Sequence, residues 1–153
     1  MGKKNKNQKK TLSRLMAIQI FFQNDFFVGQ KDLDQIKEDV INNYIIDEKD
    51  DIKSYSKEID EELLDKLLFS NVKKSDLDND IEPFLKGDWK IENLDNIMLQ
   101  ILRLGTFELK FLKDIPSNVI IDEYVDIAAS FFDSKKVTFA NAVLDNLAKK
   151  LRG

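Results

Sequence analysis

The sequence has no cysteine and no histidine among its 153 residues. Without cysteine there is no disulfide framework and no thiol chemistry. Without histidine there are no Ser-His or Cys-His nucleophile pairs, and the commonest general base and most zinc ligands are missing. The five glycines are isolated, which excludes a glycine-rich phosphate loop. We therefore expect no enzymatic activity, no metal site and no cofactor.

Turn residues and long apolar runs are also scarce. The chain has five glycines and two prolines but 42 % apolar residues, which predicts helices joined by short loops around a real core. No apolar run is long enough to span a membrane or to form a signal peptide. We expect a cytoplasmic protein that has no contact with a membrane.

Apolar residues recur at spacings of three and four along most of the chain, which predicts an all-α fold with about seven helices. The stretch 94–111 is apolar on nearly all sides, as is typical of a helix buried at the centre of a bundle. Residues 47–57 are charged and predict a solvated loop. We expect a disordered basic arm (1–10), an N-terminal helical subdomain (11–75) and a C-terminal one (76–153), packed as two small bundles.

Single residues mark the expected helix ends in the second half. Ser75 is a plausible N-cap for a short helix that ends near Gly87, with Pro83 kinking it or lying near its start. Ser134 is a plausible cap for the last helix.

Charge is spread unevenly along the chain. Residues 1–14 contain six basic residues and no acidic one, whereas the rest of the chain has 18 basic and 28 acidic residues. A mobile basic arm neutralises phosphates and steers RNA onto a surface. The same basic segment, taken by itself, is explained equally well as a tail that only increases solubility. The basic residues of this segment are Lys3, Lys4, Lys6, Lys9, Lys10 and Arg14.

Basic and aromatic residues adjoin at two places, which favours RNA over a simple tail. The arm continues into a segment with Arg14 and Phe22, and Lys135 and Lys136 precede Phe139. Bases of single-stranded RNA stack on aromatic rings, while basic groups contact the backbone. Any one of these phenylalanines is also compatible with a place in the core.

Arg103 lies within the most apolar segment of the chain. A buried guanidinium needs a carboxylate partner, and Glu108 or Glu123 is in a position to supply it. We predict a structural ion pair that fixes how helices pack, in preference to a ligand-binding role.

Three sequence blocks resemble one known family. They are Ile101–Leu109 (ILRLGTFEL), Asp114–Glu123 (DIPSNVIIDE) and Phe139–Asp145 (FANAVLD), and their order and spacing resemble those of the NusB family of transcription antitermination factors. The segment Arg14–Phe22 resembles the first helix of that family, and Trp89 lies where many members have a tryptophan. The likeness covers roughly residues 9–25 and 84–150.

The resemblance implies two roughly perpendicular helical bundles and no cofactor. It also implies binding to a single-stranded boxA-like element of ribosomal RNA leaders together with ribosomal protein NusE, within a transcription elongation complex that reads through terminators. The positions that it assigns to RNA binding are Lys10, Arg14, Phe22, Lys135, Lys136 and Phe139, and we add Lys9 from the basic segment as a further predicted RNA contact. The chain departs from the family in having mostly lysine where arginines are common, and Met98 where an acidic residue is usual.

Two alternatives remain at this point. One is a helical scaffold that binds only proteins. The other is a stand-alone relative of the RNA-binding domain found at the front of ribosomal RNA cytosine methyltransferases. A complete methyltransferase is excluded because the chain has no glycine-rich cofactor loop and no cysteine.

Overall fold

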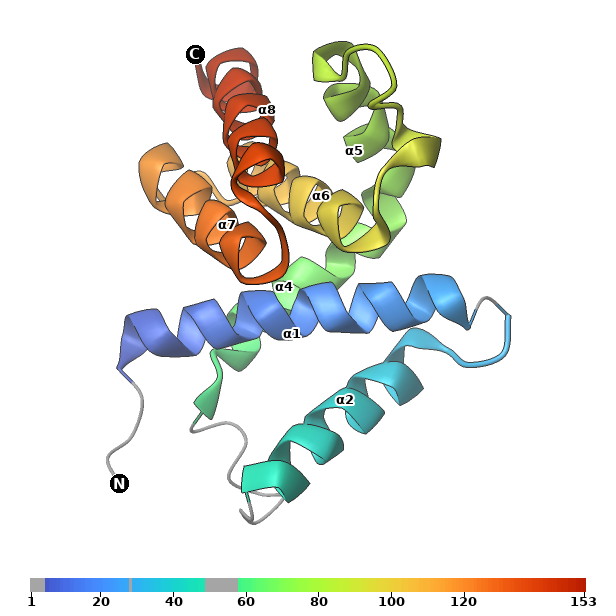
Figure 1. Cartoon of the computed structure of the whole chain (residues 1–153). Coiled ribbons are helices and arrows are strands. Elements are labelled where there is room, and N and C mark those ends of the chain that lie inside the picture. Colours follow the sequence, from blue (N-terminus) through green and yellow to red (C-terminus); the bar gives the residue numbers. More distant parts are fainter. Residues whose placement is uncertain (1–4, 28, 49–57) are drawn as a thin grey trace. The chain divides into compact units, whose positions relative to one another are not determined.

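The computed structural model describes residues 5–27, 29–48 and 58–153, with only the backbone described for residues 44–48. Within these residues the structure is helical, with seven α-helices joined by turns and short 3-10 segments, and no strand is present (Figure 1). The predicted all-α class is confirmed. The chain divides into two compact units, residues 1–68 and 69–153.

The first unit contains α1 (Lys6–Phe26) and α2 (Leu33–Glu48), which pack against each other, and most of α4 (Glu61–Phe69). A polar contact ties the start of α4 to α1: the Ser13 hydroxyl donates to the Asp60 carbonyl oxygen and accepts from the Asp60 amide, both at 2.8 Å. Asp60 also caps α4, because its carboxylate accepts from the Leu63 amide at 2.9 Å.

The basic N-terminal segment is more ordered than the sequence predicts. Helix α1 begins at Lys6, inside the segment 1–10 that we expected to be disordered, and a capping box of Asn5 and Gln8 starts it. Residues 1–4, with Lys3 and Lys4, lie outside the described residues. Of the predicted loop 47–57, residues 47 and 48 belong to α2, and 49–57 lie outside the described residues.

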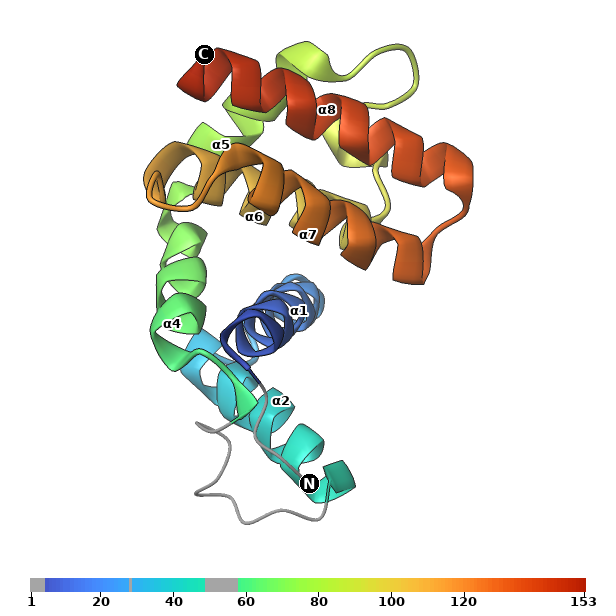
Figure 2. The same ribbon diagram turned by 90° about the vertical axis from the view of Figure 1, so that its left-hand side faces the viewer.

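The second unit is built around α6 (Asn96–Phe111), as the sequence predicts. Helix α6 packs against α5 (Lys74–Ile81), α7 (Ser117–Phe131) and α8 (Ser134–Arg152), and α7 and α8 lie side by side (Figures 1 and 2). Gly105 permits the close approach of α6 and α8: a Cβ atom there would lie 2.7 Å from Leu144 Cδ2. The division between the units precedes the predicted one at residues 75 and 76, because the short 3-10 segment Ser70–Lys73 packs against α5, which in turn packs against α6.

Both serines predicted as caps were assigned wrongly. Ser75 lies inside α5, and the residue before that helix, Lys73, makes no side-chain cap. Asp133, rather than Ser134, caps α8 by accepting from the Lys136 amide at 3.1 Å. Pro83 lies in the short 3-10 segment Glu82–Phe84, which follows α5.

Arg103 has a carboxylate partner that the sequence did not suggest. The carboxylate of Asp78 on α5 receives the guanidinium in a two-bond pair, with both N···O distances 2.8 Å. The pairing of Arg103 with Glu108 or Glu123 stays a prediction. Glu108 is fully buried and accepts a 2.5 Å hydrogen bond from the hydroxyl of Tyr124. Glu123 lies half-buried on α7.

Arg152 at the end of α8 joins three segments of the second unit. Its guanidinium donates to backbone carbonyl oxygens in the last turn of α6 and in the loop that follows, and to a hydroxyl at the start of α7. A cation at this place donates to the last carbonyls of a helix and complements the helix dipole. The acceptors are the carbonyl oxygens of Glu108, Leu109, Leu112 and Ile115 and the Ser117 hydroxyl.

None of the helices in the described ranges is long and apolar enough to cross a membrane.

Candidate nucleic-acid interface

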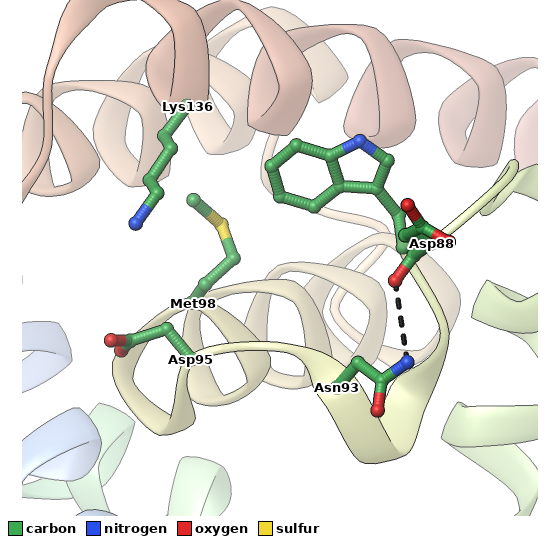
Figure 3. Close-up of a pocket in the computed structure, with 6 residues that line it drawn as sticks. Asp88, Asn93, Asp95, Met98 and Lys136 are labelled. Carbon is green, nitrogen blue, oxygen red and sulfur yellow. Dashed lines mark hydrogen bonds between the residues drawn. The ribbon is translucent and has the colours of Figure 1, made fainter.

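A pocket of about 270 Å³ lies in the second unit, where the segment before α6 meets the first turns of α8. Figure 3 shows Met98 between two groups of side chains, with Lys136 and Asp95 on one side and Asp88 and Asn93 on the other. The lining residues are Asp88, Trp89, Asn93, Asp95, Met98 and Lys136.

The segment between α5 and α6 positions the indole of Trp89 and the carboxylates of Asp88 and Asp95. Gly87 has φ +62°, a conformation that suits glycine, and the turn closes when the Trp89 amide donates to the Lys86 carbonyl at 3.2 Å. A short 3-10 segment, Ile91–Asn93, leads to Asp95, which caps α6 by accepting from the Ile97 amide at 2.9 Å. The pocket wall is therefore fixed by backbone turns and a helix cap.

Two aromatic rings stack beside the pocket. The rings of Trp89 and Phe139 are nearly parallel, with centroids 4.2 Å apart and an interplanar angle of 19°. Phe139, a predicted RNA contact, is half-buried, and one of its faces is covered by the indole. Trp89 is therefore the aromatic side chain that lines the pocket, and Phe139 supports it from behind.

The predicted residues on α8 lie within its first two turns. Lys135 is exposed, and Lys136 is partly buried, with its Nζ 5.2 Å from the centre of the Phe132 ring. Lys136 also lines the pocket, so the structure brings it and Phe139 to the same small region. The lining carries two carboxylates and one ammonium group.

The predicted residues on α1 belong to the first unit and differ in exposure. Lys9 and Lys10 are partly exposed, and Phe22 has 39 % of its surface exposed. Arg14, however, is only 1 % exposed, so its guanidinium is not presented to a ligand in this structure. The expectation of a basic surface on α1 thus depends on its lysines.

Most of the pocket lining could not be predicted from the sequence. Asp88, Asn93 and Asp95 were not named, and Trp89 and Met98 were noted only as positions in the family pattern. The signals available were the turn at Gly87 and an aspartate before a strongly apolar helix. Neither signal indicates that α8 lies opposite. In the described ranges, no group of three or more side chains could hold a metal ion.

The fold and site define a helical protein with a central buried helix and, at its edge, an aromatic pocket with both acidic and basic side chains in its lining. Residues 11–149 match the NusB family, and the chain belongs to it. Curated relatives include "Transcription antitermination protein NusB" of Sinorhizobium fredii, 48 % identical over 77 residues, which are 50 % of this chain and 48 % of that protein. The protein of the same name from Maricaulis maris is 38 % identical over 96 residues, 62 % and 60 % of the two chains. The match thus spans about half the length of the first of these relatives.

Solved structures agree in fold. T. maritima NusB has a TM-score of 0.71 and 31 % identity over 92 % of this chain and 90 % of its own. A chain in a crystal structure of antitermination factors NusB and NusE with double-stranded RNA has a TM-score of 0.71 and 24 % identity, covering 92 % and 96 %. At that identity the likeness shows the fold alone.

Proposed function

We propose that this chain is a transcription antitermination factor that binds a boxA-type ribosomal RNA leader sequence together with ribosomal protein NusE and promotes read-through by RNA polymerase. The observation that carries the proposal is the family match over residues 11–149. Its relatives bear the name transcription antitermination protein, and a neighbour in fold was solved with NusE and RNA. The proposed action is binding, without catalysis, in the cytoplasm.

In this proposal, two sets of residues are suited to contact the RNA. On α8 they are Lys135 and Lys136, beside the stacked rings of Trp89 and Phe139. On α1 they are Lys9, Lys10 and Phe22, with Arg14 omitted because it is buried. The first turn of α1 has no acidic residue, although acids stabilise a helix start. Lysines at the positive end of a helix favour a bound anion such as phosphate.

The direct test compares boxA RNA with a scrambled RNA of the same composition, each with and without NusE. We expect specific binding to boxA that NusE tightens. About four phosphate contacts would give a log–log salt slope of roughly −3 for a single strand. Equal binding to the two RNAs in the presence of NusE would contradict the proposal, and absence of any RNA binding would favour a protein scaffold.

Charge reversal at the start of α8 tests the RNA surface. We expect the double substitution Lys135→Glu and Lys136→Glu to weaken boxA binding and to flatten the salt slope by about 1.4, since each lost phosphate contact removes about 0.7. Fluorescence anisotropy at several salt concentrations measures both quantities. The matched control is Lys149→Glu with Lys150→Glu, the same charge change in exposed residues at the other end of α8. Equal effects of the two double variants would show that RNA responds only to overall charge.

A further inference from the structure

We propose that the pocket beside Trp89 receives one unstacked RNA base and selects a base that carries an exocyclic amino group. This inference rests on the proposed function and deepens it by naming the part of the RNA that the pocket reads. It follows from the size of the pocket, the polar atoms on its rim and the mixture of charges in its lining (Figure 3).

The size and apolar surface of the pocket suit a single base. Its volume of about 270 Å³ lies just below the roughly 300–1,000 Å³ of sites for drug-sized ligands. The indole of Trp89 and the side chain of Met98, which is 1 % exposed, supply flat and polarisable surface. The stack on Phe139 holds the indole in place. Base–aromatic contact is the general way in which proteins hold unpaired bases.

The polar rim offers acceptors to such a base. Asp95 uses one carboxylate oxygen, Oδ1, to accept from the Ile97 amide at 2.9 Å, and an ionised carboxylate has further lone pairs. Asn93 donates its Nδ2 weakly, at 3.5 Å, to the carbonyl oxygen of Asp88, and its Oδ1 remains an acceptor. A carboxylate recognises an amino group such as cytosine N4. Uracil has a carbonyl oxygen at that position, which a carboxylate repels.

The mixture of charges argues against two other occupants. A phosphate group inside the pocket would meet the carboxylates of Asp88 and Asp95. A lysine or arginine side chain of a protein partner would be attracted by these carboxylates but would also meet the ammonium group of Lys136 in the same lining. A neutral base with an amino edge avoids both repulsions, while Lys135 and Lys136 lie close enough in sequence to contact the adjoining phosphates.

The experiment uses Trp89 as its reporter, since it is the one tryptophan in the sequence. Oligocytidylate and oligouridylate of equal length are titrated into the full chain, with tryptophan emission and the anisotropy of labelled RNA recorded in parallel. Cytosine and uracil have the same ring size and differ at the position that the carboxylate would read. We expect oligocytidylate to bind about tenfold more tightly or better, because one correct base contact discriminates at roughly this level. We also expect it to change the emission of Trp89.

Asp95→Asn is the decisive variant. Asparagine caps helices as well as aspartate does, so α6 keeps its start while the charge is removed. We expect the preference for cytosine to fall to about twofold or less, with RNA binding retained. Asp133→Asn is the matched control: it makes the same change at the cap of α8, and Asp133 does not line the pocket. The control should keep the cytosine preference.

The outcomes separate the inference from the proposed function. Equal binding of the two oligonucleotides, or RNA binding that leaves Trp89 emission unchanged, would overturn the base pocket while boxA binding with NusE still stood. A cytosine preference that survives Asp95→Asn would also overturn it. If lysine-rich or arginine-rich peptides, and no RNA, changed the emission, the pocket would belong to a protein partner. If none of the RNAs bound to the protein, boxA RNA with NusE included, both proposals would be contradicted.

Discussion

Arg152→Met is expected to lower the free energy of unfolding of the second unit by about 3 kcal/mol, because it removes the donor to five partly buried acceptors, of which only the carbonyl oxygens of Glu108 and Leu112 also accept from a backbone amide among the hydrogen bonds described. The guanidinium donates to five acceptors at 2.6–3.3 Å, four of them backbone carbonyl oxygens at the end of α6 and in the loop after it. Methionine keeps much of the apolar stem of arginine, so the change tests mainly the hydrogen bonds and the charge. Urea denaturation followed by Trp89 emission measures the effect within this unit.

Lys149→Met is the matched control for Arg152. Lys149 lies three residues earlier on the same helix, is 74 % exposed in its side chain, and forms a surface pair with Asp145 at 3.3 Å. Such pairs contribute roughly 0–1 kcal/mol, so the control should change stability by about 0.5 kcal/mol or less. If the two variants unfolded at the same urea concentration, the hydrogen bonds of Arg152 would not stabilise the end of α6.

Periodicity predicted the helices well because burial on one face is visible in the order of residues. The stretch 94–111 was expected to be central, and α6 is packed against α5, α7 and α8. Helix ends were predicted less well. At the start of α8, Ser134 and Asp133 are neighbours with similar capping ability, and the backbone conformation decides in favour of Asp133. That conformation is not encoded in the identity of either residue alone.

Site residues that lie close together in the sequence could be predicted, whereas those that only the tertiary structure brings together could not. Lys135, Lys136 and Phe139 are close in sequence, so one helix brings them together. The opposing wall, with Trp89 and Asp95, comes from a separate segment that precedes α6. The burial of Arg14 could not be predicted, because charge is usually a guide to exposure, yet this arginine is buried. Asp78 was missed as the partner of Arg103 since the pair joins two helices 25 residues apart in sequence.

Asp78→Ala is expected to destabilise the second unit by about 3 kcal/mol, because it removes both charge-assisted hydrogen bonds that join Arg103 on α6 to Asp78 on α5. Both side chains are largely shielded, with 12 % of Arg103 and 23 % of Asp78 exposed, so solvent compensates little. Asp80→Ala is the control two residues away. It removes one contact of 2.7 Å to Lys110, in a pair whose side chains are 17 % (Asp80) and 32 % (Lys110) exposed, and should cost less, about 1–2 kcal/mol, because one hydrogen bond is lost in place of two. Urea unfolding curves followed by Trp89 emission compare the two.

Adding Arg103→Met to Asp78→Ala separates the ion pair from simple loss of packing. Removing one partner of a shielded pair strands a charge, whereas replacing both partners with apolar groups is often close to neutral. The double variant should therefore be more stable than Asp78→Ala alone, by about 1–2 kcal/mol. A double variant less stable than Asp78→Ala would mean that Arg103 stabilises the unit mainly through its other contacts. In that case Asp78 would hold α5 against α6 without being the main partner of this guanidinium.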